Sequence, residues 1–272
     1  MFIIPAKDRV WEMNAPQIMG IINTTPDSFY DQSRKISSAE VINKVHEFIK
    51  EGVNVVDIGG QSTRPGAKKV DVKDEMERVI PIIKDIRDSF PDLLISIDTY
   101  VNEVANEALI AGANIVNDIS CGQYEPEILK TVAKHNAGFI GMHVSALSQE
   151  MHKITPTTME DIIAYFKIKK KLMAQNGITH WVVDPGFGFG KTVEDNFNII
   201  KELASLSVLD LPILIGVSRK SSIYKTLGIE ASQALNGTTV VNTIGLLNGA
   251  HILRVHDVKE AQQIIQLLPY LQ

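Results

Sequence analysis

Residues 53–66, VNVVDIGGQSTRPG, join a short apolar run to a polar cluster. The run, Val53–Ile58, has the length and the β-branched composition of a strand buried on both faces, as in a parallel sheet. Seven more apolar runs recur at intervals long enough to hold a helix, and nearly all of them end in polar residues: Ile18–Ile22, Leu93–Ile97, Ala113–Val116, Phe139–Met142, Trp181–Val183, Ile213–Val217 and His251–Leu253.

Eight such runs predict a TIM (β/α)8 barrel, an α/β fold that takes about 250 residues. The 272 residues are therefore expected to form a single domain, 1–272. Segments with helical periodicity lie between the runs. In this fold the residues just past the strand ends share one face, which holds the active site. The polar clusters are thus predicted to converge in one pocket, next to three long polar segments, 23–38, 59–72 and 144–157.

Composition and charge limit the kinds of partner and substrate that the chain is expected to bind. The net charge of −5 argues against a nucleic-acid partner, and no apolar stretch approaches the length of a membrane span, so neither partner is expected. One cysteine, Cys121, and an N-terminus without a signal-peptide pattern favour the cytoplasm. Basic residues nevertheless follow the predicted strands, which indicates an anionic small-molecule substrate: Arg64, Arg219, Lys220, Arg254 and His256.

The glycine-rich stretch 184–192, DPGFGFGKT, invites comparison with phosphate-binding loops. Its glycine spacing fits neither the P-loop nor the dinucleotide-binding fingerprint. Two interpretations remain. The stretch is a flexible loop, or its backbone closely approaches a ligand whose polar edge meets Asp184, with Phe187 or Phe189 as an apolar wall.

Three polar residues, Asp98, Asn117 and Asp184, follow three different strands. A flat ligand with a guanidine-like edge, such as a pterin or a guanine, offers adjacent N–H donors to a carboxylate, and Asn117 can donate and accept. Lys220 would then donate to a ring carbonyl. Alternatively, each of the three residues only caps a strand–helix junction.

A second set, Asn23, Arg254 and His256, lies on the first and last strands, which are neighbours in a closed barrel. Arg and His bind phosphate oxygens. An Asn carbonyl suits Mg²⁺ that also holds substrate phosphates. This set predicts a phosphate site with Asn23 as a metal ligand. A further outer pocket is expected from Thr63, Arg64, Pro65, Lys220 and Ser221.

The chain resembles the dihydropteroate synthases along nearly its whole length. The motifs that carry the resemblance are MGIINTTPDSF (19–29), GGQSTRPGA (59–67), IDT (97–99), NDI (117–119), DPGFGFGK (184–191), SRKS (218–221) and RVHDV (254–258). The resemblance implies a homodimeric, Mg²⁺-dependent TIM-barrel transferase. Such an enzyme joins 6-hydroxymethyl-7,8-dihydropterin pyrophosphate to p-aminobenzoate, giving 7,8-dihydropteroate and pyrophosphate in folate biosynthesis, and sulfonamides compete with p-aminobenzoate.

The resemblance also implies roles for individual residues. The pterin would be bound by Asp98, Asn117, Asp184 and Lys220, with Met142 and Phe189 lining the pocket and Gly216 among the substrate-binding residues. The pyrophosphate and Mg²⁺ would be held by Asn23, Arg254 and His256. The p-aminobenzoate site would comprise Thr63, Arg64, Pro65, Phe189, Lys220 and Ser221. Asp31 would stabilise a cationic pterin methylene, so the implied catalytic set is Asp31, Arg64, Lys220, Arg254 and His256.

Four departures from the family pattern bear on loop order and drug response, and none removes a predicted chemical group: Gln32-Ser33, Gln61, Val144-Ser145-Ala146 and Tyr224. Two other functions compete with this interpretation. A pterin-binding methyltransferase with a corrinoid partner has no need of Arg254 or His256, whose presence argues against it. A non-enzymatic pterin-binding homologue would retain pterin binding without turnover.

Overall fold

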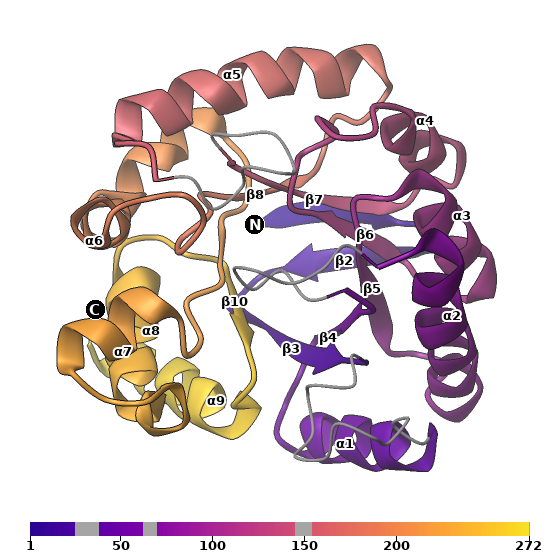
Figure 1. Cartoon of the computed structure of the whole chain (residues 1–272), viewed down its shortest axis with the longest axis horizontal. Coiled ribbons are helices and arrows are strands. Elements are labelled where there is room, and N and C mark those ends of the chain that lie inside the picture. The colour runs from indigo at the N-terminus through magenta and orange to yellow at the C-terminus, as the bar shows by residue number, and fades with distance from the viewer. Residues whose placement is uncertain (25–37, 62–69, 145–153, 272) are drawn as a thin grey trace.

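Eight parallel strands form a barrel (Figure 1). The computed structural model describes residues 1–24, 38–61, 70–144 and 154–271. Each barrel strand pairs with its neighbour in the chain, and β10 pairs with β3. The gap between β8 and β9 is closed by one bridge, Val183–Ile213. The strands are β3 (Gln17–Asn23), β4 (Val55–Gly59), β5 (Leu94–Asp98), β6 (Ile115–Asp118), β7 (Gly138–Met142), β8 (Val182–Asp184), β9 (Leu214–Ile215) and β10 (Ile252–Val255). The predicted barrel and its eight strands are confirmed.

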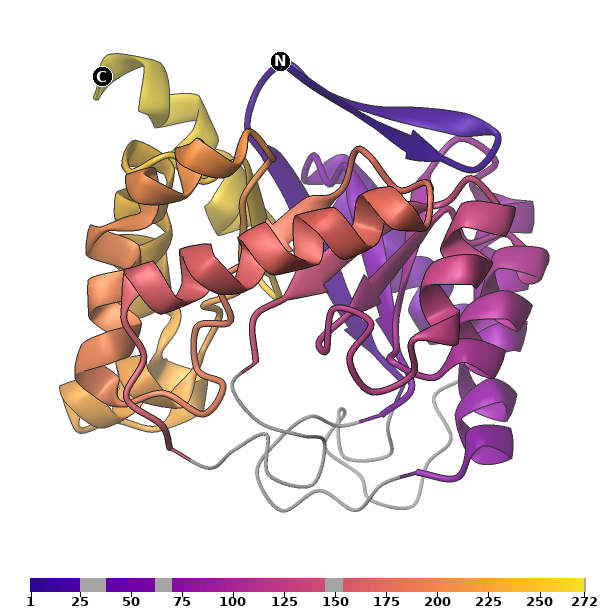
Figure 2. The same ribbon diagram turned by 90° about the horizontal axis from the view of Figure 1, so that it is seen from above.

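Helices surround the barrel on its outside (Figures 1 and 2). All of them except α9, which follows the last strand, lie between successive strands, as the alternating pattern predicts. Two of them, α5 and α6, begin with a capping box in which a threonine and an aspartate three residues later bond to each other's backbone N–H. The helices are α1 (Ser38–Lys50), α2 (Val72–Ser89), α3 (Asn102–Ala111), α4 (Glu127–Lys134), α5 (Met159–Gln175), α6 (Val193–Lys201), α7 (Ser221–Leu227), α8 (Leu235–Leu247) and α9 (Val258–Leu267).

An N-terminal β-hairpin, which was not predicted, lies across one end of the barrel (Figure 2). It consists of β1 (Phe2–Ala6) and β2 (Arg9–Met13), joined by a turn in which Lys7 has a φ of 66°. Alternate residues of the hairpin are buried and exposed, so one face is apolar: Ile4, Ala6, Trp11 and Met13. This face packs against the apolar strand residues at the bottom of the barrel interior and shields them from water.

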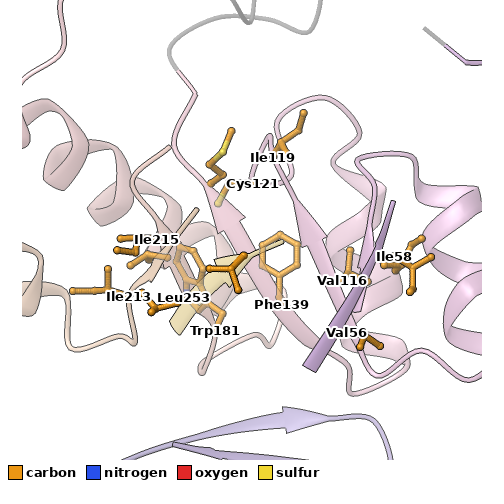
Figure 3. Close-up of a cluster of buried hydrophobic side chains, with 14 of the residues drawn as sticks. Val56, Ile58, Val116, Ile119, Cys121, Phe139, Trp181, Ile213, Ile215 and Leu253 are labelled. Carbon is orange, nitrogen blue, oxygen red and sulfur yellow. The ribbon is translucent and has the colours of Figure 1, made fainter. Parts of the chain in front are cut away.

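The strand residues divide into two apolar sets because successive side chains point to opposite faces. The outward set packs against the helices, and Figure 3 shows part of it: Val56, Ile58, Val116, Phe139, Trp181, Ile213, Ile215 and Leu253. The inward set forms a layer across the bottom of the barrel with the hairpin: Met19, Val55, Ile115, Ile140, Val182, Leu214 and Ile252. The barrel is therefore a filled core on which a site can rest.

Within the described residues, no helix is long and apolar enough to cross a membrane. Most of the long segments expected around the pocket fall outside the described residues. The same is true of four predicted site residues: Asp31, Thr63, Arg64 and Pro65.

Candidate active site

A polar layer lies directly above the apolar layer inside the barrel. Moving two residues along a strand returns to the same face. From the inward apolar residues of six strands, this step reaches Asp57, Asn117, Met142, Asp184, Gly216 and Arg254. Five of these six were predicted as site residues, and the sixth, Asp57, was not. The six strands thus place these residues in one layer inside the barrel.

The strand register places the next residues side by side at the carboxyl ends. Asn23 of β3 pairs with Gly59, Gly59 pairs with Asp98, and Asp98 pairs with Asn117. Asn23 and Asp98 therefore flank the single glycine that separates them. A Cβ built on Gly59 would lie 3.6 Å from Asn23 Oδ1 and 3.7 Å from Asp98 Oδ2, so both side chains reach over this position.

Arg254 joins the two predicted sets of site residues. Its Nε donates to Asp57 Oδ2 and its Nη2 to Asp98 Oδ2, both at 2.6 Å. The same Asp57 oxygen accepts from Asn117 Nδ2 at 3.0 Å. The predicted phosphate-binding arginine is thus held by carboxylates, one of which was predicted to bind the pterin.

The charges in this cluster shift one another's pKa values. Burial raises the pKa of Asp98 to about 7, although the Arg254 guanidinium opposes the shift. For Arg254, burial lowers the pKa, but Asp57 and Asp98 outweigh it and the net shift is upward. The cluster therefore holds a fixed cation beside a carboxyl group that titrates near neutral pH.

Asp184 stands at the start of the glycine-rich loop, opposite Met142 in the register. Its Oδ1 accepts from the N–H of Gly186 at 2.7 Å, and burial raises its pKa. Gly186 has a φ of 74°, and a Cβ there would lie 2.1 Å from the carbonyl oxygen of His143. The loop thus approaches the neighbouring backbone too closely for any side chain at Gly186.

Lys191 stabilises this loop through hydrogen bonds to its backbone carbonyls. Its Nζ donates to the carbonyls of Gly186 at 2.9 Å and Phe189 at 3.2 Å, and the side chain is buried. Burial lowers the pKa of Lys191 to about 7. The lysine that suggests a P-loop therefore binds the protein's own backbone, in agreement with the sequence-based rejection of that motif.

Lys220 is the residue directly before α7, and its side chain contacts the same glycine-rich loop. Its Nζ donates to the carbonyl of Phe187 and lies 4.4 Å from the ring centroid of Phe189. Burial lowers its pKa to about 8, opposed by the carboxylate of Asp184. Of the two aromatic residues considered as a wall, Phe187 is buried in the core and Phe189 is half-buried beside the cation, so the structure favours Phe189.

The remaining predicted residues complete this end of the barrel. A Cβ on Gly216 would lie 3.8 Å from Arg254 Cβ and 3.9 Å from Asp184 Oδ2, which places that glycine between them. Ser221 is the first residue of α7. His256 follows β10, two residues after Arg254 on the same face, and its Nδ1 lies 2.9 Å from Ser218 Oγ. No described group of three His, Cys, Asp or Glu residues could hold a metal.

Asp57 was missed although the sequence carries a signal for it. It is a carboxylate inside the run Val53–Ile58, completely buried and two residues beyond an inward valine. A charge in a strand buried on both faces needs a buried partner. The missing partner, Arg254, is 197 residues away in the chain, so sequence proximity gives no hint of it.

Comparisons with known proteins show which family the chain belongs to. The family model of the pterin binding enzymes matches residues 19–256. The dihydropteroate synthase of Synechocystis is 41% identical over 92% of this chain and 88% of its own length. The Yersinia pestis enzyme, solved with a sulfonamide drug complex, aligns with a TM-score of 0.92 at 33% identity over 99% of both chains. The Coxiella burnetii enzyme in complex with pteroic acid aligns with a TM-score of 0.89 at 30% identity, over 100% of this chain and 98% of that one.

A family match over most of the chain and whole-length relatives above 30% identity leave one assignment: the chain belongs to the pterin binding enzymes and, within them, to the dihydropteroate synthases.

Proposed function

We propose that this chain is a transferase of folate biosynthesis. It joins 6-hydroxymethyl-7,8-dihydropterin pyrophosphate to p-aminobenzoate and releases 7,8-dihydropteroate and pyrophosphate. The observation that carries the proposal is the group of polar side chains at the strand ends. It consists of the carboxylates of Asp98 and Asp184, the amide of Asn117 and the guanidinium of Arg254. The relatives named above, one of them with pteroic acid, support the same reaction.

The pterin would lie on this group of side chains. Asp184 keeps one oxygen on the loop backbone and offers the other to the guanidine-like edge of the ring. Lys220 has three N–H donors, and its bond to Phe187 leaves two for a ring carbonyl. Met142 and Phe189 supply apolar contact to the ring faces. A flat, polar-edged ring fits these donors and acceptors.

In the reaction, the bond between the pterin methylene carbon and the pyrophosphate oxygen breaks. A bond from that carbon to the amine nitrogen of p-aminobenzoate forms, and the amine loses a proton. Arg254 would neutralise charge on the leaving pyrophosphate, and His256 would donate a hydrogen bond to one of its oxygens. Asp31 is proposed to stabilise positive charge at the methylene. The weakly basic amine then needs correct positioning.

We also propose Mg²⁺ as the cofactor. Asn23 would supply an amide oxygen to it, because this hard oxygen stands at the end of β3 beside Asp98. When bound, the ion would neutralise charge on the pyrophosphate oxygens. The p-aminobenzoate site is proposed to comprise Phe189, Lys220 and Ser221 together with Thr63, Arg64 and Pro65.

A homodimer is proposed on the surface of α7 and α8, which lie next to each other (Figure 1). Three residues of α8 at helical spacing expose large apolar side chains: Val240 (51%), Ile244 (42%) and Leu247 (43%). Leu227 of α7 is exposed as well. A second copy of the chain would cover this stripe. The cytoplasm is the proposed location, because the buried thiol of Cys121 suits a reducing compartment.

The test measures pyrophosphate release by the purified protein with Mg²⁺ and the dihydropterin pyrophosphate, with and without p-aminobenzoate. We expect release that depends on p-aminobenzoate, yields dihydropteroate and falls when a sulfonamide is added. Asp184→Asn should lose most of the turnover, whereas the exposed Asp88→Asn should keep it. Pterin binding without release would instead support a binding protein or a methyltransferase.

A further inference from the structure

Two loops that follow adjacent strands meet at Ser218 and His256. Ser218, after β9, is buried, and its Oγ lies 2.9 Å from Nδ1 of His256. The same Oγ accepts a bond from the backbone N–H of His256 at 3.3 Å. One hydroxyl therefore contacts both the main chain and the ring of the histidine.

The direction of the hydrogen bond between Ser218 Oγ and His256 Nδ1 depends on which ring nitrogen carries the proton. A serine hydroxyl has one hydrogen to donate and can accept through its oxygen. Its oxygen accepts from the backbone N–H of His256, and Nδ1 is the one acceptor that it contacts in the described part of the chain. If the hydroxyl donates to Nδ1, a neutral ring must carry its hydrogen on Nε2. The nitrogen turned away from Ser218 is then a hydrogen-bond donor.

The next residue pair fixes the position of the same two loops. The guanidinium of Arg219 donates to both carboxylate oxygens of Asp257, each at 2.9 Å. Such bidentate pairs hold their partners in one orientation. Arg219 also donates to the carbonyl of Ser232 at 2.6 Å, and its backbone N–H donates to Thr238 Oγ1 at 2.9 Å. The backbone that carries His256 is thus tied to the backbone that carries Ser218.

We infer that Ser218 is a positioning residue that keeps His256 in the Nε2–H form, aimed as a donor at an oxygen of the pyrophosphate group. This inference rests on the proposed function, in which His256 binds the pyrophosphate. A pyrophosphate oxygen accepts hydrogen bonds and donates none when ionised. A ring in the Nδ1–H form would present an acceptor to an acceptor, so the tautomer determines whether the contact is attractive.

The tautomer can be measured directly. Two-bond nitrogen–proton spectra of the protein labelled with ¹⁵N-histidine distinguish a protonated ring nitrogen from an unprotonated one. The spectrum of His256→Gln identifies the His256 signals among the seven histidines. We expect the Nε2–H form in the unmodified protein and a shift towards Nδ1–H in Ser218→Ala. An Nδ1–H form in the unmodified protein, or an unchanged tautomer in Ser218→Ala, would overturn the inference.

Calorimetry with magnesium pyrophosphate tests the consequence without turnover. We expect Ser218→Ala to weaken pyrophosphate binding about fivefold, the equivalent of one ordinary hydrogen bond. Ser218→Thr, which keeps the hydroxyl, should restore it. Ser96→Ala is the matched control, because it removes another buried hydroxyl that has no bonded partner in the described residues. Unchanged pyrophosphate affinity in Ser218→Ala would contradict the inference.

The two proposals fail in different ways. If the unmodified protein releases no pyrophosphate in the presence of p-aminobenzoate, the proposed function fails, while the spectra and the calorimetry still report on Ser218. If turnover is normal and Ser218→Ala leaves the KM for the pterin pyrophosphate and the tautomer unchanged, only the inference fails. Where turnover is normal, Ser218→Ala should leave the KM for p-aminobenzoate unchanged.

Discussion

The guanidinium of Arg254 donates through Nε to the completely buried carboxylate of Asp57, at a distance of 2.6 Å. The same oxygen of Asp57, Oδ2, also accepts a hydrogen bond from the side-chain amide of Asn117. It therefore orients two predicted substrate-binding side chains from below, without standing at a strand end itself.

Replacing Asp57 by Asn should be costly. The substitution removes the charge that balances Arg254, and breaking one partner of a buried ion pair costs about 3–5 kcal/mol. We expect a loss of about 3 kcal/mol in the free energy of unfolding, because Asp98 still pairs with Arg254. Urea unfolding measures this loss. The control is Asp92→Asn, whose carboxylate is exposed and pairs with Arg9. It should cost less than about 1 kcal/mol. Equal losses would show that the buried pair contributes no more than the exposed one.

Gly186→Ala should disrupt the glycine-rich loop. A Cβ there meets the carbonyl oxygen of His143 at 2.1 Å, in addition to the strain of a φ of 74°. Gly177 separates the two effects: its φ is 81°, and a Cβ there has nothing within 4 Å. We expect Gly177→Ala to cost about 1 kcal/mol of unfolding free energy through backbone strain alone. Gly186→Ala should cost well over that and abolish pterin binding. Similar losses in the two variants would argue against the close approach.

Lys191→Met should change how stability depends on pH. An unfolded lysine keeps its proton up to about pH 10.4, whereas burial lowers the pKa of Lys191 in the folded protein to about 7. Between these values the unfolded state binds more protons, so the free energy of unfolding rises with pH. In the variant, we expect the slope of the unfolding free energy against pH to decrease by up to about 1.4 kcal/mol per pH unit. The exposed Lys201→Met should keep the slope. A slope that survives in Lys191→Met would show that other groups cause it.

The barrel could be predicted because its strands are buried on both faces, which leaves continuous apolar runs in the sequence. The hairpin was missed for the opposite reason. Its strands are buried on one face, and the alternation that identifies them extends over just five residues each, β1 and β2. That alternation becomes meaningful only when the apolar bottom of the barrel is known to need a cover.

The site could be predicted where a polar residue ends a strand, as Asp98 and Asp184 do. It could not be predicted where the partner is remote. Which donor bonds to which carboxylate depends on how the strands are aligned across the barrel. From the sequence alone, Arg254 could equally have bound only a phosphate. The structure instead places it on Asp57 and Asp98.

The pKa of Asp98 leads to a pH dependence of pterin binding. Burial raises that pKa to about 7. Above this value the carboxylate is ionised, pairs with Arg254 and can accept N–H donors of a pterin. Below it, the proton removes an acceptor and one charge of the pair. The affinity for a pterin should therefore fall as the pH falls through 7.

The measurement uses 6-hydroxymethylpterin, which has no phosphate to titrate, and follows its fluorescence between about pH 5.5 and 7.5. We expect the Kd to rise towards roughly tenfold per pH unit below the pKa, since affinity scales with the ionised fraction of Asp98. Asp98→Asn keeps an oxygen acceptor but cannot titrate, so its Kd should be higher at pH 7.5 and nearly constant over the range. The exposed Asp88→Asn should follow the unmodified protein. If Asp98→Asn retains the full pH dependence, another buried group governs it, and Asp184, whose pKa burial also raises, becomes the next residue to replace.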